Sequence, residues 1–233
     1  ASADAETVAE MAARCHRWDD IEINYKGGVL TSTGHGFSGR SRRTLLELLA
    51  RRCREAGVRL FFEHGIDDPA VLAEADLVFA ADGVNSVVRE RYREHFQPSV
   101  DLRPNRFVWL GTTRAFPAFT FYFKSDPHGL WRVHAYQYEP DRSTFIVEAR
   151  EDTWRAAGLD RASETETLAF CEDLFSDELA GHRLISNRSI WRSFPTIQNA
   201  HWHHGNIVLA GDAAHTAHFS IGSGTKLAME DAI

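Results

Sequence analysis

An aspartate and a pair of glycines near the end of the chain have the spacing of a ligand-binding site. Residues 207–210 form a short apolar run, typical of a buried parallel strand, and Gly211 and Asp212 follow it directly. Ligands of open α/β sheets bind at the carboxyl ends of the strands, where the Asp212 carboxylate can accept hydrogen bonds from hydroxyl groups. Gly222 and Gly224 then precede a predicted helix, whose first N–H groups attract an anion. The stretch predicts a site for a ligand with hydroxyls and an anionic edge.

A second apolar run ends in the same way near the middle of the chain. Residues 77–81 predict another buried strand, which Asp82 and Gly83 close. Ser86 and Arg89 follow at fixed spacing on the next helix. A lone Asp–Gly pair is usually an ordinary turn. Because this order mirrors the closing stretch, the two motifs together argue for a binding site.

Arg42 is expected in the first turn of a helix over 42–56 that Ser41 caps. A cation is unfavourable at that end of the helix dipole, which suggests an anionic partner. The alternative is a solvated basic patch, which is the better explanation of Arg42 taken by itself. Several more arginines surround it: Arg40, Arg43, Arg51, Arg52 and Arg54.

The two strand motifs resemble those of the single-component aromatic hydroxylases, the p-hydroxybenzoate hydroxylase-like FAD monooxygenases. The segment GDAAH, together with the glycine pair, is similar to their second flavin motif. Residues 82–89 are similar to their DG motif. Arg42, followed by Leu45, is similar to the arginine that contacts the flavin in that family. The version HFSIGSGTKLAMEDA is similar to that of salicylyl-CoA 5-hydroxylases and 2-aminobenzoyl-CoA monooxygenases. Phe219 and Lys226 depart from the wider family, which has Pro and Asn there.

The resemblance implies FAD as the cofactor and NAD(P)H as the reductant. In the family, the residue that matches Asp212 holds the ribityl chain, and the helix start near Gly224 faces the flavin edge that becomes anionic on reduction. The cofactor-binding residues implied by the resemblance are Arg42, Asp82, Gly83, Arg89, Gly211, Asp212, Gly222, Gly224 and Thr225. No nearby side chain is an obvious acid or base, so the only catalytic candidates are His218 and Lys226.

Aromatic, strand-like segments lie between the two motifs. They predict an antiparallel sheet, with Pro, Gly and Asp turns separating residues 107–112, 119–124, 130–138 and 144–149. In the family such a sheet covers the flavin and forms the substrate pocket. Alternation places Arg132 on one face with three residues that we expect to hold an aromatic substrate: His134, Tyr136 and Tyr138. The alternative is a solvated face with cross-strand aromatic packing.

The amino-acid composition limits which other functions and locations are expected for this chain. The 233 residues are 43% hydrophobic and 25% charged, a globular composition, and the net charge of −7 argues against nucleic-acid binding. No run is apolar enough to span a membrane and no signal peptide is visible. The three cysteines are widely spaced, which indicates reduced thiols and a cytoplasmic setting. Five histidines between residues 201 and 218 lack a partner at metal-ligand spacing, so no metal site is predicted.

The predicted fold is α/β: part of a glutathione-reductase-like FAD-binding domain with an inserted antiparallel β-sheet substrate domain. Residues 1–103 and 194–233 are assigned to the FAD-binding domain and 104–193 to the substrate domain, with a hairpin at 19–34 that could join the substrate sheet. Because no GxGxxG motif follows an opening strand, we expect an internal piece of a longer protein. Further expected elements are a helix over 5–18 and a strand over 58–63.

The resemblance implies hydroxylation of an electron-rich aromatic substrate, such as an aryl-CoA thioester, through a flavin hydroperoxide. Two alternatives share the fold: a flavin-dependent reductase and a halogenase. A third is a non-catalytic protein that has lost its nucleotide site. The sequence does not distinguish NADH from NADPH, identify the acyl group or give the oligomeric state.

Overall fold

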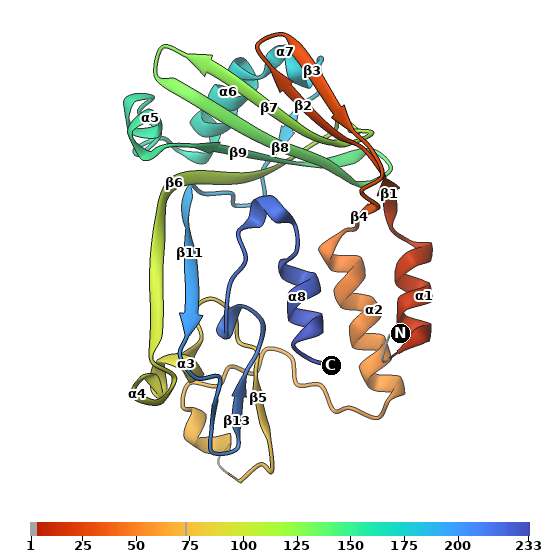
Figure 1. Cartoon of the computed structure of the whole chain (residues 1–233), viewed down its shortest axis with the longest axis vertical. Helices are drawn as coiled ribbons and strands as arrows, with labels where there is room; N and C mark the ends of the chain where they lie inside the picture. Colours follow the sequence, from red (N-terminus) through yellow and green to blue (C-terminus); the bar gives the residue numbers. More distant parts are fainter. Residues whose placement is uncertain (1–3, 73) are drawn as a thin grey trace. The chain divides into compact units, whose positions relative to one another are not determined.

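The computed structural model describes residues 4–72 and 74–233. The chain folds into two compact units, each built from two stretches (Figure 1). The first unit joins the chain up to Leu60 with Pro104–Arg192, and the second joins Phe61–Arg103 with Ser193–Ile233. The predicted division into a flavin domain and a substrate domain stays a prediction.

A large sheet organises the first unit, in the strand order β10-β6-β9-β8-β7-β2-β3. Most neighbouring strands are antiparallel, whereas β2 runs parallel to β7. Because β2 pairs with β7, the hairpin formed by β2 and β3 belongs to this sheet. The strands are β2 (Ile21–Tyr25), β3 (Gly28–Ser32), β6 (Pro98–Thr112), β7 (Phe119–Asp126), β8 (Gly129–Glu139), β9 (Arg142–Ala149) and β10 (Leu184–Ile185).

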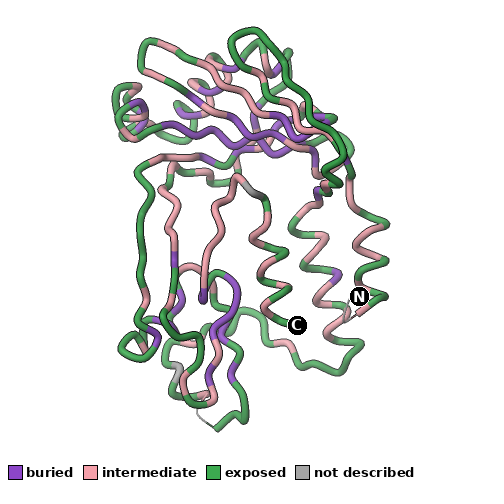
Figure 2. The backbone as a smooth tube through the Cα atoms, viewed as in Figure 1, coloured by how far each residue is buried: buried purple, intermediate pink, exposed green. Residues whose placement is uncertain are grey.

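The core of this unit lies between one face of the sheet and three short helices. Alternate residues of β6, β8 and β9 point into it because side chains of a strand alternate between faces. Figure 2 shows the buried positions along these strands. The helices are α5 (Glu151–Ala156), α6 (Glu164–Leu174) and α7 (Ser176–Leu179). The core includes Val108, Leu110, Trp131, Val133, Phe145, Val147, Leu159, Cys171, Phe175 and Leu179.

Cys171 gives a simple test of this core. Its side chain is fully buried, and burial raises the pKa of its thiol to about 12. Since the thiolate is the reactive form, a thiol reagent at pH 8 should modify the partly exposed Cys15 and Cys53 while sparing Cys171. Mass spectrometry of the folded and the denatured chain would count the labels. Equal labelling of all three thiols in the folded chain would show that the core opens readily.

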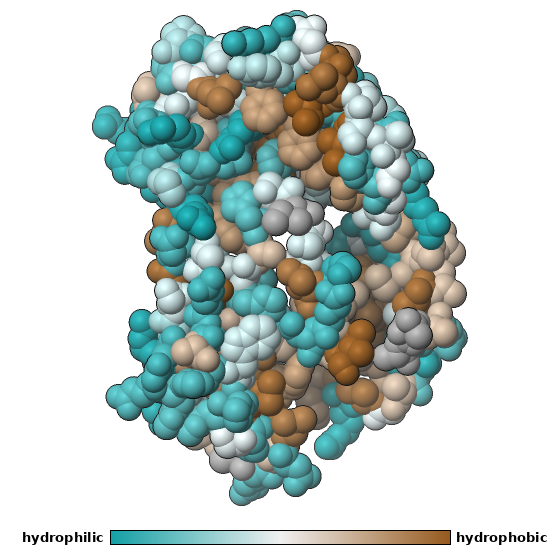
Figure 3. Space-filling view, viewed as in Figure 1, coloured by the Kyte–Doolittle hydropathy of each residue, from teal (hydrophilic) through white to brown (hydrophobic). Residues whose placement is uncertain are grey.

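The β2–β3 hairpin ends the sheet and presents apolar side chains to solvent. All five residues of β3 are exposed, including Val29 and Leu30. Figure 3 shows hydrophobic groups gathered over this hairpin at the top of the view. The hairpin is therefore held mainly through the pairing of β2 with β7.

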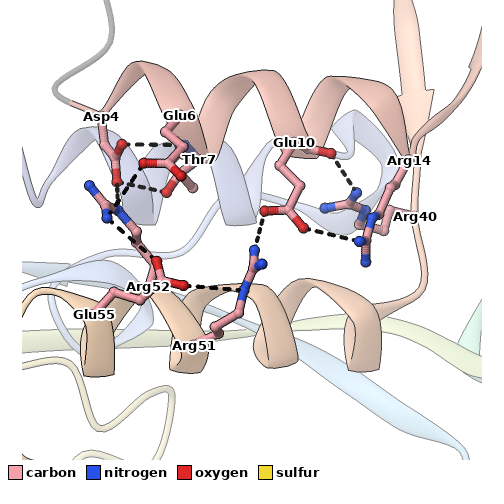
Figure 4. A network of polar contacts seen from close by, with 9 residues as sticks. All are labelled: Asp4, Glu6, Thr7, Glu10, Arg14, Arg40, Arg51, Arg52 and Glu55. Atoms are coloured by element: carbon pink, nitrogen blue, oxygen red, sulfur yellow. Dashed lines mark hydrogen bonds and ion pairs between the residues drawn. The ribbon is translucent and has the colours of Figure 1, made fainter.

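An ion-pair network joins α1 (Ala5–Ala13) to α2 (Arg42–Glu55), as Figure 4 shows. Arg52 Nε donates to Asp4 Oδ2 at 2.7 Å, and the Asp4 carboxylate also caps α1 by accepting from Thr7. Arg51 pairs with Glu10 on the same side. These contacts fix α1 against α2, although surface pairs of this kind each contribute little to stability.

Acid should loosen α1 from α2. The hydrogen bond from Arg52 and those from Thr7 lower the pKa of Asp4 from 3.8 to about 2. Because the folded pKa is depressed, the stabilisation is complete above pH 3.8 and disappears as the pH falls through about 2. Hydrogen exchange of the α1 amides should accelerate across that window. Asp4→Asn should remove this pH dependence; an unchanged profile in the variant would contradict the assignment to Asp4.

The second unit contains a small sheet in the order β12-β13-β5. Its strands are β5 (Val78–Ala80), β12 (His203–His204) and β13 (Ile207–Leu209), and β11 (Arg192–Asn199) enters this unit. The helices are α3 (Val87–Arg91), α4 (Arg93–Phe96) and α8 (Gly224–Glu230), with 3-10 turns at Pro69–Leu72, Gly211–Ala213 and Phe219–Ile221. A core of Val78, Ala80, Val88, Phe96, Ile207, Leu209 and Ala214 joins the sheet to its helices.

Two sequence-based predictions of local structure are wrong. Residues 58–63 form no strand; Phe61 and Phe62 are exposed, and Glu63 takes a positive φ of 55°. An apolar run needs a neighbouring strand to become a strand itself, and this one has none in the described chain. The predicted helix over 5–18 ends at Ala13, because His16–Trp18 instead forms β1, which pairs with β4 (Phe37–Gly39).

Candidate functional site

Two strand ends lie side by side in the second unit. β5 and β13 are parallel and in register, with Ala80 opposite Leu209, and Ala210 N donates to Ala80 O at 3.0 Å. The motifs that follow the strands, Asp82–Gly83 and Gly211–Asp212, therefore leave the same edge of the sheet. This is the edge where ligands of α/β sheets bind.

The turn after β13 depends on Gly211. Its φ is +57°, a region that favours glycine, and an added Cβ would lie 3.3 Å from the Ala228 Cβ in α8. Gly211 N donates to the Asp231 carboxylate at 2.7 Å, and His215 Nε2 lies 2.9 Å from the same Asp231 oxygen. The carboxyl end of α8 thus fixes the turn. Asp212 remains exposed, and its side chain has no hydrogen bond within the described residues.

Arg89 connects the two motifs. Its side chain is buried; Nη1 donates to Ala213 O at 3.1 Å, and Nη2 donates to Val84 O at 2.5 Å. Burial lowers the pKa of this guanidinium, which the Asp82 charge opposes. The contacts show an arginine that holds the two loops together. Its predicted contact with the cofactor stays a prediction.

The start of α3 is capped by the residues of the first motif. Ser86 Oγ accepts from Arg89 N at 2.9 Å, and Asp82 Oδ2 accepts from Val88 N at 3.2 Å. Gly83 has a φ of +84°, and a Cβ added to it would meet nothing within 4 Å. The fixed spacing of these residues in the sequence therefore has a local structural reason, which stands beside the predicted role in binding.

The glycine pair before α8 leaves space near the backbone. Gly222 has a φ of +69°, and a Cβ added to Gly222 or Gly224 would meet nothing within 4 Å. Thr225 is exposed in the first turn of α8. An open backbone of this kind lets a ligand approach closely. The three positions are consistent with a cofactor cradle, and their contacts stay predictions.

The two catalytic candidates engage in local contacts. Lys226 forms an ion pair with Glu230 one turn later in α8. His218 Nδ1 accepts from Ser220 N at 3.3 Å and lies 2.8 Å from Ser220 Oγ. The His218 ring also packs on Phe219, at 4.4 Å between ring centroids. These contacts tie Lys226 to the carboxylate of Glu230 and His218 to its sequence neighbours, and the catalytic roles of both stay predictions.

The remaining predicted residues lie in the first unit. Arg42 begins α2, is exposed, and forms no ion pair within the described residues. His134 and Tyr136 are on the sheet face opposite the core. Burial raises the pKa of Tyr136, and the hydrogen bond with Thr144 partly opposes this rise. Burial also raises the pKa of Tyr138. The Tyr136 ring has aromatic neighbours, Trp18 at 6.0 Å and Phe119 at 5.4 Å.

Sequence reasoning missed one polar residue on this face, Glu148. It is 2% exposed and lies opposite Arg132 in β8, and Arg132 Nη2 donates to its Oε1 at 2.6 Å. Alternation along the predicted strand over 144–149 could have identified it, because Thr144, Ile146 and Glu148 share a face. The available signal was an acidic residue that shares one face of this strand with Thr144 and Ile146.

Two other kinds of site are absent from the part of the chain that the structure describes. No helix there combines the length and apolar character needed to cross a membrane. Nor do His, Cys, Asp and Glu side chains gather there in groups of three or more that could hold a metal ion.

Comparison with known proteins decides the family. The model of the FAD-binding domain family matches residues 36–233. The chain belongs to this family. The predicted family and the predicted α/β fold are thereby confirmed, and FAD is supported as the cofactor of this FAD-binding chain.

Curated relatives of this FAD-binding chain include two bacterial enzymes. Salicyloyl-CoA 5-hydroxylase of a Streptomyces species is 42% identical over 239 residues, covering 98% of the chain and 46% of the relative. The 3-hydroxy-4-methyl-anthranilyl-[aryl-carrier protein] 5-monooxygenase of Streptosporangium sibiricum is 42% identical over 230 residues, covering 99% of the chain and 61% of the relative. The chain thus spans about half the length of the curated relatives it matches.

A solved structure supports the fold of this FAD-binding chain. The tetrameric form of 2-methyl-3-hydroxypyridine-5-carboxylic acid oxygenase matches with a TM-score of 0.76 at 19% identity. The match covers 96% of the chain and 64% of that protein. At this identity the likeness establishes the architecture alone.

Proposed function

We propose that the full-length protein is an FAD-dependent monooxygenase that hydroxylates an electron-rich aromatic ring carried as a thioester. The observation that supports this most strongly is the pair of aligned strand ends, β5 and β13, joined by Arg89. The carboxyl ends of parallel strands are where ligands of α/β sheets bind, and the chain belongs to the FAD-binding domain family.

The residues present fit the flavin half of FAD. Asp212 offers an exposed carboxylate with no side-chain partner in the described chain, suited to the hydroxyls of the ribityl group. Gly222 and Gly224 leave open space beside the backbone at the start of α8. Bound FAD would supply the redox chemistry that activates O₂, and we propose NAD(P)H as the source of electrons.

The protein's own contribution is orientation and exclusion of water. The sheet face with His134 and Tyr136 offers an apolar, aromatic surface on which a ring can pack, with a few polar groups to orient it. Holding the ring in one pose converts binding energy into rate. The free thiols are compatible with the proposed cytoplasmic setting.

The names of two relatives support the proposed thioester. One is named for a CoA ester and the other for an aryl group on a carrier protein. A thioester withdraws electrons from the ring, so an electrophilic oxygen donor needs a hydroxyl or amino group on that ring to activate it. We therefore propose a benzoyl thioester with such a group beside the thioester carbonyl.

Substrate-stimulated NAD(P)H oxidation by the full-length, FAD-loaded protein tests the proposal. The CoA thioesters of 2-hydroxybenzoate and 2-aminobenzoate should stimulate oxidation, and the free acids should not. Hydroxylation of a free acid with both thioesters inert would refute the thioester class while keeping the monooxygenase. A halogenase would require halide for product, a reductase would give no oxygenated product, and a non-catalytic protein would show no stimulation at all.

A further inference from the structure

The sheet face opposite the core carries charged groups inside rows of aromatic side chains. The strand registers define these rows, because residues directly opposite on neighbouring strands share a face. One row reads Phe107, Glu148, Arg132 and Phe123. The next reads Trp109, Ile146, His134 and Phe121. The polar groups of Glu148, Arg132 and His134 thus meet between aromatic side chains at the ends of the two rows.

Within the described residues, only one of the two carboxylate oxygens of Glu148 accepts hydrogen bonds. Oε1 accepts from Asn105 Nδ2 and from Arg132 Nη2, both at 2.6 Å. Oε2 has no hydrogen bond within the described residues and lies 3.8 Å from His134 Nε2, which is too long for a hydrogen bond. An ionised carboxylate has several acceptor positions, so Oε2 keeps the capacity to bind a donor.

The position of this carboxylate is difficult to explain by stability alone. The side chains of Glu148 and His134 are only 3% and 6% exposed. Moving a charged group out of water costs free energy. A protein with an apolar residue at such a position would often be as stable as one with the ion pair, or more stable. The low exposure also strengthens any hydrogen bond that a ligand makes there. These conditions favour recognition of a specific polar group.

The spacing of the two atoms fits one small donor group. A hydroxyl or amino group can lie at about 2.8–3.0 Å from both Oε2 and Nε2, because those atoms are only 3.8 Å apart. Phe121 packs beside His134 with 4.9 Å between ring centroids, so an aromatic surface adjoins the pair. The geometry suits an aromatic ring that carries a single donor group.

We propose that Glu148 and His134 bind the hydroxyl or amino group that activates the substrate ring, and that they select rings whose activating group carries a hydrogen. This inference rests on the proposed function. A carboxylate only accepts, so it can bind a ring hydroxyl and a ring amine equally well. A ring without such a hydrogen leaves the buried oxygen unpaired and is rejected.

Binding to the wild-type, full-length, FAD-loaded protein tests this without turnover. The probes are the CoA thioesters of 2-hydroxybenzoate, 2-aminobenzoate and benzoate, and the change in flavin absorbance reports binding. We expect the unsubstituted benzoyl thioester to bind about 100-fold more weakly than the other two. Equal affinity for all three thioesters would overturn the inference, whether or not any Glu148 variant folds.

Glu148→Gln then tests the residue itself. The variant keeps an oxygen for Asn105 and Arg132 but presents an NH₂ donor in place of Oε2. A ring hydroxyl can accept a hydrogen bond from that donor, whereas a ring amine is a poor acceptor. The affinity for the 2-amino thioester should therefore fall about 30-fold, and the affinity for the 2-hydroxy thioester should fall less. Binding of the unsubstituted thioester should not change.

The matched control is Glu178→Gln. Glu178 pairs with Lys124 at 2.9 Å in the same unit, is 18% exposed, and has no place on the aromatic rows. Its variant should bind all three thioesters as the wild type does. Uniform weakening of the three by Glu148→Gln would mean a structural role and would overturn the inference. An absence of hydroxylation by the wild type, with ring selectivity intact, would instead count against the proposed function.

Discussion

Arg89→Leu is expected to destabilise the second unit by about 2–4 kcal/mol, because it removes a buried, charged donor from two backbone carbonyls. Val84 O and Ala213 O lose this donor. Ala213 O keeps a longer hydrogen bond from Asn199 Nδ2 at 3.3 Å. Since those carbonyls belong to the loops after β5 and β13, FAD binding should weaken as well. Denaturant unfolding of the full-length protein, with and without FAD, measures both effects.

Arg93→Ala is the matched control for Arg89. Arg93 follows four residues later, is exposed, and pairs only with Glu90 at 3.0 Å among the described residues. Exposed pairs of this kind contribute about 0–1 kcal/mol, so this variant should unfold almost as the wild type does. Similar unfolding midpoints for the Arg89 and Arg93 variants would show that the bridge between the two loops has little energetic weight.

Asp212→Ala is expected to weaken FAD binding by the full-length protein by roughly 10- to 150-fold, which corresponds to about 1.5–3 kcal/mol for a hydrogen bond to a charged group. The exposed carboxylate makes no structural hydrogen bond in the described chain, so the fold should stay intact. Fluorescence titration gives the affinity, and the unfolding midpoint without FAD controls for structure. Unchanged affinity would remove Asp212 from the cofactor site.

Much of the site could be predicted because its strands are short apolar runs that end in Asp and Gly. Residues 77–81 and 207–210 contain β5 and β13, with an error of one residue at their ends. Their parallel pairing follows from the strand–helix order, since parallel neighbours need a long connection. The hairpin at 19–34 was also predictable, because glycines between two alternating runs are typical of a tight turn; in the structure Lys26 and Gly27 have positive φ.

What could not be predicted depends on contacts between distant residues. Arg89 donates to Ala213 O, 124 residues later, and no local pattern reports that contact. Glu148 is set by Asn105, 43 residues earlier, and by the register with β8. The apolar run at 58–63 looks like a strand in isolation and lacks a neighbour to pair with in the described chain. Sequence patterns predict faces and ends of elements; the partners of buried polar groups come from tertiary packing.

Incorporation of oxygen from ¹⁸O₂ tests the central claim most directly. The full-length protein, loaded with FAD and supplied with NAD(P)H and a 2-hydroxy- or 2-aminobenzoyl thioester, should give a product with one ¹⁸O atom on the ring for each NAD(P)H consumed. Mass spectrometry of the hydrolysed product reads this out. Oxidation of NAD(P)H by the FAD-loaded protein with no ¹⁸O in the ring would contradict the account.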